Sequence, residues 1–486
     1  MNKQLKRVSI LIFLMFVALM TSTSIIQVFQ ADNLAADPRN KRTLYDSFDV
    51  ERGAILVNGV PVAQSMPTGD NYKFQREYPQ GDLYAAVTGY YTIDQGTTGI
   101  ESSMNSELSG TSSSQFLDKI NRIVTGQPPQ GASVELTLDP VVQQAARDAL
   151  GTLQGAVVAM RPKTGEILAM VSTPTYDPNL MTSHDSAEVI ANYKALLADP
   201  AKPLDNRAIT GSLNPPGSTF KLVVAAAALE SGNYTPESTF ANTGGYQLPG
   251  SSSVVRNSWR GTCGSGPTTT LLLGLTMSCN TPFAELAATM GNTDLHAQAE
   301  KFGFGQDLGI PTKVTPSIFP RTQDSARTAL SGIGQADVRA TPLQMAMVSA
   351  AIANDGKLMK PQLVQRVVAP NLSTISEFEP EVFSEPISSA TAETLTEMMV
   401  NVVSAPNGSA RTATIDGVRV AGKTGTAENG TVAPYTLWFT GFAPADDPEV
   451  VVAVVVEDGG GLGQNGTSEG IAAPIGKKVI EAVLNQ

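Results

Sequence analysis

An apolar segment close to the N-terminus decides on which side of a membrane the rest of this chain folds. Lys3, Lys6 and Arg7 precede a run at residues 8–28 whose centre, residues 10–20, carries no polar side chain. Because a positive flank stays in the cytoplasm, the residues after the run are expected outside it. The strictly apolar part is short enough for a cleaved signal peptide, but no convincing A-x-A site follows, and the run extends towards the roughly 20 residues that a span requires. The pattern favours an uncleaved, single-pass signal anchor in the cell membrane.

Composition narrows the classes of function. The chain has 486 residues, which predicts about two or three folding units with a sizeable core. Its 33 Lys and Arg against 45 Asp and Glu give a net charge of -12, which argues against nucleic acid as the main partner. With only His184 and His296 in the chain, a His-rich metal site is nearly ruled out. The chemistry must depend on other groups.

Three regions follow one another along the chain. Residues 1–30 form a cytoplasmic tail and the anchor helix, residues 31–130 are rich in Gly, Ser and Thr and predict a small, mostly β module, and residues 131–486 predict a mixed α/β domain. Strands, then helices, then strands and a helix favour mixed or antiparallel pairing. The expected elements of the last region are strands at 134–138, 155–160, 166–171, 418–422, 437–443 and 449–457 and helices at 141–153, 219–231, 268–290, 343–353 and 472–484.

Three short motifs match well-known patterns in the wrong context. Residues 417–424 fit the Walker A pattern, but the apolar alternation lies inside the loop and no helix pattern follows. Residues 461–466 fit a dinucleotide fingerprint without the second strand that it requires. Residues 466–470 fit the nucleophile elbow around Ser468, yet neither Asp nor His follows to complete a triad. We interpret all three as flexible turns beside a sheet edge.

A fourth pattern carries chemistry. Ser218 and Lys221 lie three residues apart at the expected start of a helix, so both side chains share one face. A Lys amine so placed can take the Ser proton, and the positive end of the helix dipole favours the developing alkoxide. Ser278 and Asn280 lie in a break of the helical region at residues 276–282. Their hydroxyl and amide are expected to reach the same cleft.

The third piece is the run Lys423-Thr424-Gly425-Thr426, which closes an apolar strand. With S-T-F-K at 218–221 and S-C-N at 278–280, the K-T-G run resembles the signature S-x-x-K, S-D-N and K-T-G of penicillin-binding proteins and class A β-lactamases. The chain resembles a class B penicillin-binding protein, the transpeptidase of peptidoglycan synthesis, and most closely the actinobacterial penicillin-binding protein A type. The resemblance implies a transpeptidase domain with an antiparallel sheet and flanking helices, preceded by a pedestal domain.

The resemblance covers nearly the whole chain. Residues 39–40 and 52–55 resemble the family's juxtamembrane start, and residues 96–101 resemble a pedestal motif. Two departures are visible: Cys279 stands where the signature has Asp, and Ala336 stands where Gly-Gln-Gly is commoner. Neither departure removes a group with assigned chemistry.

The resemblance also implies a role for each residue of the three motifs. Ser218 attacks the carbonyl of the penultimate D-Ala of a stem peptide, Lys221 acts as its base, and Ser278 relays the proton to the departing D-Ala. The backbone N–H groups of Ser218 and Thr426 form the oxyanion hole. No metal or organic cofactor is required. The residues implied in substrate binding are Asn280, Lys423, Thr424, Gly425 and Thr426.

Several alternatives stay open at this point. A D,D-carboxypeptidase or a β-lactamase uses the same acyl-enzyme, although no stretch resembling the E-x-x-L-N element of class A β-lactamases lies between Ser278 and Lys423. A catalytically idle scaffold or β-lactam sensor is an alternative of another class. As partners we expect stem peptides, β-lactams and a SEDS-type glycan polymerase. Cys263 and Cys279, the only cysteines, form either a disulfide or two free buried thiols.

Overall fold

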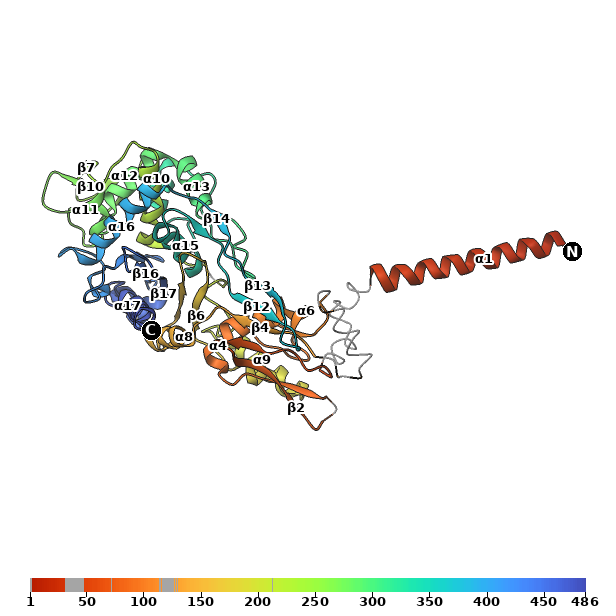
Figure 1. Ribbon diagram of the computed structural model, residues 1–486. Helices are drawn as coiled ribbons and strands as arrows, with labels where there is room; N and C mark the ends of the chain where they lie inside the picture. The colour runs from red at the N-terminus through yellow and green to blue at the C-terminus, as the bar shows by residue number, and fades with distance from the viewer. Residues whose placement is uncertain are drawn as a thin grey trace.

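The computed structural model describes residues 2–30, 48–70, 72–112, 115, 126, 128, 130–211 and 213–486 (Figure 1). The pair at residues 39–40, which resembles a juxtamembrane motif, lies outside the described residues. The N-terminal run forms α1 (Asn2–Ser24), continued by a short π-helical turn (Ile25–Phe29). Among the described residues this is the one helix long and apolar enough to cross a membrane, with a mean hydropathy of 2.3 over its best window. It is a candidate membrane anchor.

The N-terminal module is built on a sheet that later parts of the chain complete. β1 (Ile55–Val57) and β2 (Val60–Pro67) form a hairpin whose turn residues, Asn58 and Gly59, both have positive φ, as a two-residue hairpin turn requires. The strand order is β13-β12-β4-β1-β2-β3, and β1 and β4 run parallel. Strands distant in sequence therefore lie side by side here (Figure 1). The other four strands are β3 (Phe74–Glu77), β4 (Ser133–Leu136), β12 (Val364–Val368) and β13 (Thr374–Glu377).

This module is less β-rich than the sequence predicted, because three short helices, α4 (Gly81–Thr88), α5 (Gly99–Ser103) and α6 (Asn105–Leu108), pack with the strands. Their amphipathic periods are too short to stand out in a Gly- and Ser-rich stretch.

A buried ion network lies in the same module. Glu101, fully buried, accepts hydrogen bonds from Arg52 Nε at 2.6 Å and Arg76 Nε at 2.7 Å, and from the Tyr78 hydroxyl at 3.2 Å. Burial raises the pKa of the Glu101 carboxyl, but the two guanidiniums outweigh this effect and hold its pKa below the usual value. A buried carboxylate with two charged partners is satisfied, and removal of Glu101 would leave two buried guanidiniums without their counter-charge.

The larger domain is organised around a five-stranded antiparallel sheet in the order β15-β16-β17-β5-β6. The predicted hairpin at residues 155–171 is confirmed. β17 pairs with β5, with Ala453 opposite Val158, although the two strands lie near opposite ends of the domain's sequence. The antiparallel sheet with flanking helices is therefore also confirmed. Its strands are β5 (Gly155–Met160), β6 (Ile167–Thr173), β15 (Ala421–Ala427), β16 (Thr436–Ala443) and β17 (Val450–Val456).

Helices cover both faces of this sheet. Phe439 on β16 lies under α17 (Ala472–Leu484), because a Cβ added to Gly476 would meet its ring at 2.3 Å. The next residue, Thr440, bonds Ser349 on α15 (Pro342–Ala353) at 2.7 Å. Since successive side chains of a strand point to opposite faces, α15 and α17 lie on opposite sides of the sheet. Covered on both faces, β5 and β17 are continuous apolar runs.

Three predicted elements differ from the structure. The helix expected at 268–290 is divided into β10 (Thr268–Thr270), α11 (Leu271–Thr276) and α12 (Thr281–Met290), because three β-branched residues pair with β7 (Thr239–Ala241). The strand expected at 418–422 begins at Ala421 and continues through the K-T-G run. The helix expected at 219–231 is preceded by a 3₁₀ turn, η4 (Gly217–Phe220), and begins as α10 (Lys221–Glu230).

The remaining helices are α8 (Pro140–Leu150), α9 (Ser186–Ala198), α13 (Asn292–Lys301), α14 (Ser325–Ser331) and α16 (Ser389–Ser404), with 3₁₀ turns η3 (Pro178–Met181), η5 (Arg411–Ala413), η6 (Asp458–Gly461) and η7 (Gly463–Asn465). The remaining strands are β8 (Tyr246–Gln247), β9 (Val254–Val255), β11 (Leu358–Met359) and β14 (Val382–Ser384).

Candidate active site

The turn that carries Ser218 is held against the edge strand β15 at the closest distance that a backbone allows. Gly217 has a φ of +53°, and a Cβ at this position would meet the carbonyl oxygen of Thr426 at 2.7 Å. On the strand side, a Cβ on Gly425 would meet Pro216 O at 2.7 Å and Thr219 N at 2.9 Å. Both positions therefore require glycine. The small residue of the K-T-G run brings the strand beside Ser218, which is half-buried at the start of α10.

Lys221 lies one turn after Ser218 and is fully buried. Its Nζ donates to the backbone carbonyl of Ser278 at 2.8 Å and to Asn280 Oδ1 at 2.9 Å. Burial, together with the nearby charge of Lys423, lowers the pKa of the Lys221 amine well below its ordinary value. A buried amine with a lowered pKa is available in its neutral form near neutral pH.

Lys423 reaches the same segment from the sheet. It is fully buried, and its Nζ donates to Ser278 Oγ at 2.7 Å and to Thr424 O at 2.8 Å. Burial lowers the pKa of Lys423 to about 7. The two amines thus contact Ser278 from two directions, Lys221 at its carbonyl and Lys423 at its hydroxyl.

Ser278 itself has a strained backbone. Its φ of +61° lies in the left-handed region, which non-glycine residues rarely adopt. Such strain persists only where surrounding contacts determine the conformation, and it is concentrated at functional sites. The break between α11 and α12, expected from the sequence, therefore brings Ser278 and Asn280 to the two lysines.

The two threonines of the K-T-G-T run have different surroundings. The Thr424 hydroxyl is buried and donates to Ser409, with Oγ1 3.2 Å from the carbonyl oxygen and 3.1 Å from Oγ. Thr426 is exposed, and its Oγ1 lies 2.8 Å from Ser468 Oγ. Ser468 also donates to the carbonyl of Gly425 at 2.6 Å, so Thr426 must be the donor in the contact between the two hydroxyls. The unliganded Thr426 therefore directs its proton to Ser468.

Ser468 is a residue whose role the sequence did not reveal. We interpreted residues 466–470 as a flexible turn, yet Ser468 is only 3% exposed and bonds to two residues of β15. Ser409 was missed in the same way. No spacing signal predicts the observed contacts of either residue, because both act through contacts between segments far apart in the chain.

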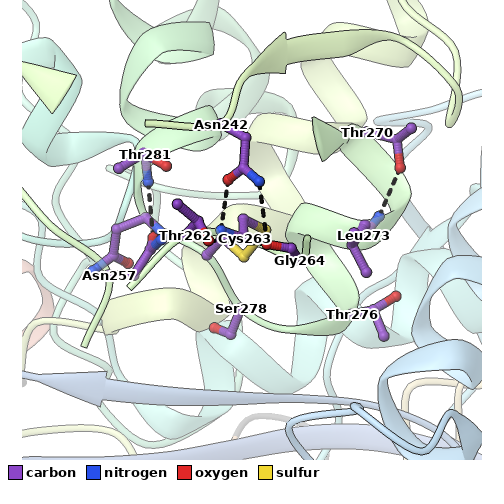
Figure 2. The surroundings of a disulfide bond; sticks show 12 residues. Asn242, Asn257, Thr262, Cys263, Gly264, Thr270, Leu273, Thr276, Ser278 and Thr281 are labelled. Atoms are coloured by element: carbon purple, nitrogen blue, oxygen red, sulfur yellow. Dashed lines mark hydrogen bonds between the residues drawn. A yellow bond between two sulfur atoms is a disulfide. The ribbon is translucent and has the colours of Figure 1, made fainter. Parts of the chain in front are cut away.

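A disulfide joins Cys263 to Cys279, with the two Cα atoms 5.9 Å apart (Figure 2). Both cysteines are buried. The bond closes a loop with a sequence separation of 16, which corresponds to roughly 3 kcal/mol in the chain-entropy treatment. It anchors the residue that lies between Ser278 and Asn280. In the part of the chain that the structure describes, no group of three or more His, Cys, Asp or Glu residues is arranged to hold a metal ion.

The sequence and the fold match those of known proteins. A family model described as the penicillin binding protein transpeptidase domain matches residues 155–481, and one described as the penicillin binding protein A dimerisation domain matches residues 52–134. A protein of Mycolicibacterium smegmatis named peptidoglycan D,D-transpeptidase PbpA is 42% identical over 495 aligned residues, covering 100% of both chains. A protein of Mycobacterium tuberculosis with the same name is 40% identical, covering 100% of this chain and 99% of its own length.

Solved structures of similar fold belong to the same family. A ceftriaxone acyl-enzyme complex of penicillin-binding protein A from M. tuberculosis superposes with a TM-score of 0.87 at 38% identity, covering 90% of this chain and 100% of that chain. A penicillin G acyl-enzyme complex of the same protein gives a TM-score of 0.84 with the same identity and coverage. The resemblance inferred from the motifs is confirmed, and the chain belongs to the penicillin-binding protein transpeptidase family.

Proposed function

We propose that this protein is a serine D,D-transpeptidase that cross-links peptidoglycan stem peptides through an acyl-enzyme and is a target of β-lactams. The observation that carries this function is the full-length similarity to proteins named peptidoglycan D,D-transpeptidase. The geometry of the site supports the same function. Two buried amines contact Ser278 in the segment that follows α11, and β15 lies directly beside the turn of Ser218. Covalent catalysis suits such a site, because it divides one acyl transfer into two easier steps.

The hydrogen bonds of Lys221 support its assignment as the base for Ser218. A neutral amine has two N–H donors and one lone pair, and in this site the donors are used by Ser278 O and Asn280 Oδ1. The lone pair remains to accept the Ser218 proton as Oγ attacks the penultimate D-Ala carbonyl. This step requires Lys221 to be uncharged, and the lowered pKa of its amine meets that requirement.

Ser278 and Lys423 are assigned to the departure of D-Ala. Ser278 Oγ accepts a hydrogen bond from Lys423, so its own proton is available for the nitrogen of the leaving D-Ala. The proton that Lys221 took from Ser218 then passes to Ser278 within the same cluster. Ser278 thereby regains its proton, and Lys221 is neutral again. An acceptor amine then reverses the sequence, attacks the ester carbonyl and releases Ser218.

Substrate binding is assigned to the edge of β15 and to Asn280. The backbone N–H groups of Ser218 and Thr426 form the oxyanion hole, where the loss of one donor typically costs about 3 kcal/mol. Lys423 and Thr426 bind the terminal carboxylate, for which Thr426 must turn its proton from Ser468 to the ligand. Asn280 Nδ2 and Oδ1 are in use within the protein, so its substrate contact needs a small rearrangement. The Thr424 hydroxyl is bonded to Ser409, so we assign Thr424 to the support of this edge rather than to a direct hydrogen bond with the substrate.

The fate of the acyl-enzyme distinguishes this function from hydrolysis. We expect benzylpenicillin to acylate the protein quickly and to leave slowly, because no dedicated carboxylate base for water was recognised in the sequence. Stopped-flow acylation and a chase with unlabelled drug measure both rates. Muropeptide mass spectrometry of the products made by the full-length protein should reveal cross-linked dimers. Fast turnover of benzylpenicillin favours a β-lactamase, trimmed monomers alone favour a D,D-carboxypeptidase, and no acylation at all favours an idle scaffold.

The arrangement in the cell follows from the three regions. We assign residues 1–30 to a cytoplasmic tail and membrane anchor, 31–130 to a pedestal module and 131–486 to the transpeptidase domain, which then lies outside the cytoplasm. The apolar helix α1 and the match to a dimerisation-domain model support this division.

A SEDS-type glycan polymerase is the expected membrane partner, because a transpeptidase needs strands to join and the anchor and pedestal provide surfaces in and above the membrane. Replacing residues 1–30 by an unrelated anchor should weaken the association several-fold while leaving penicillin labelling intact. Co-purification of the tagged pair from detergent measures this effect. Unchanged recovery of the polymerase with the exchanged anchor would contradict the assignment.

A further inference from the structure

Asn257 is a buried polar residue outside the three motifs whose whole side chain is used by the active-site region. It follows β9 in the loop that ends at Cys263 and is 1% exposed. Its Oδ1 accepts from the backbone N–H of Asn280 at 2.7 Å and of Thr281 at 3.3 Å. Its Nδ2 donates to Gly261 O at 2.9 Å. Figure 2 shows Asn257 beside Thr281, on the side of the disulfide where α12 begins.

These contacts supply an acceptor for N–H groups at the start of α12. The first N–H groups of a helix have no partner within the helix, and Asn is among the residues that best supply one as the N-cap. Asn280 occupies the N-cap position of α12 but makes no capping bond with its own side chain. Its Oδ1 instead accepts from Lys221, and its Nδ2 donates to Arg256 O at 2.9 Å. Asn257 therefore acts as a cap supplied from another segment.

We propose that Asn257 is a positioning residue for acyl transfer, which sets the orientation of the Ser278–Asn280 segment by capping α12 in place of Asn280. Because Asn257 satisfies the N–H groups of Asn280 and Thr281, the Asn280 side chain is free to face Lys221. Without Asn257 the N–H groups of Asn280 and Thr281 lose their acceptor, and the segment that holds the Asn280 oxygen against Lys221 loses the contact that orients it. The inference depends on the proposed function, since acylation of Ser218 is its readout.

A matched control contacts the same loop from the segment that follows β7. Asn242 is also buried, and it accepts from Cys263 N at 2.6 Å and donates to Gly264 O at 3.3 Å and Gly266 O at 2.8 Å. Figure 2 shows Asn242 directly beside the disulfide, with its side chain bonded to the backbone at Cys263 and Gly264. Asn242 thus supports the disulfide loop as much as Asn257 does, but it touches neither Asn280 nor Thr281 in these hydrogen bonds.

The test compares full-length, detergent-solubilised variants by thermal unfolding and by the second-order rate constant for acylation with a fluorescent penicillin. N257A should acylate about 10- to 100-fold more slowly, the effect of losing one or two buried hydrogen bonds in the transition state. N257D keeps an oxygen for both N–H groups and should recover most of the rate. N242A should lose thermal stability but acylate within about threefold of wild type, because its hydrogen bonds hold the Cys263 loop, which the disulfide still ties to Cys279, and not the N–H groups of Asn280 and Thr281.

Three results would overturn the proposal: acylation of N257A at the wild-type rate, N257D as slow as N257A, or N242A as slow as N257A at equal stability. If N257A does not fold, N257Q makes the same test. Its side chain is one methylene longer, which moves the amide oxygen away from the two N–H groups, so slow acylation is expected. A wild-type rate for N257Q would then overturn it. Failure of the proposed function gives a different result, namely a wild-type protein that the penicillin does not label.

Discussion

Ser218→Ala should abolish covalent labelling by a fluorescent penicillin while leaving the fold intact. The half-buried hydroxyl lies at the start of α10, one turn before the buried amine of Lys221. Removing the nucleophile of a catalytic set that acts as a unit typically costs about 10⁴-fold or more in rate. Labelling on a denaturing gel and the mass of the protein after incubation with benzylpenicillin measure the loss. Because an alanine fits where the serine lies, the unfolding temperature should change little.

Ser468→Ala is the matched control for this experiment. Ser468 belongs to the other serine motif, residues 466–470, and it is buried against Gly425 and Thr426. The variant should still take up one equivalent of drug, at a reduced rate, since it loses only the support for Thr426. Persistent labelling of Ser218→Ala, or a complete loss in Ser468→Ala alone, would reverse the assignment of the nucleophile.

Lys423→Met should make the protein more stable at low pH and nearly inactive. The folded protein lowers the pKa of Lys423 to about 7, against 10.5 for an exposed lysine, because burial opposes its charge. Each pKa unit corresponds to about 1.4 kcal/mol, so charging this amine at pH 6 costs the folded state about 5 kcal/mol. A methionine fills the same space without that cost. Acylation should fall by about 10²- to 10³-fold, because Ser278 and the substrate carboxylate lose their cation.

The pH dependence distinguishes this explanation from a general packing effect. Between pH 7 and 10.5 the folded protein binds fewer protons at Lys423 than the unfolded chain, so wild-type stability rises with pH over this window. Lys423 contributes about 2.5 kcal/mol of the gain from pH 6 to pH 9, and Lys423→Met should lose this part while keeping the rise that the buried amine of Lys221 adds. Denaturant unfolding of both proteins at the two pH values gives the measurement. Lys194→Met, at an exposed position of α9, should retain the wild-type slope, and a retained slope in Lys423→Met would refute the role of burial.

What the sequence predicted about this protein was local or rested on the family resemblance. The apolar run of the anchor, the hairpin at residues 155–171 and the final helix at 472–484 were all predicted, since each depends on a hydrophobic period within one short segment. The spacing of Ser218 and Lys221 predicted a candidate nucleophile and base for the same reason. With the S-C-N and K-T-G runs, the resemblance identified the family, which the comparisons confirmed.

Only the tertiary structure decided how these pieces meet. Polar residues in Lys423–Thr426 looked like the end of a strand, although they lie within β15 because their backbone pairs with β16. β12 and β13 complete a sheet that begins some 300 residues earlier, and a pairing partner so distant leaves no periodic signal in either segment.

The supporting residues of the site were decided in the same way. Asn257 lies in no motif, and the motif around Ser468 predicted a different role, because a hydrogen bond between two loops depends on where the folded chain places them. A hydrophobic period is written within one segment and can be recognised there, whereas the pKa of Lys423 and the orientation of Asn280 depend on groups brought together by folding. The sequence therefore determined which residues could react, and the tertiary structure decided which charges are buried, which helix end is capped from another loop and which proton faces the substrate.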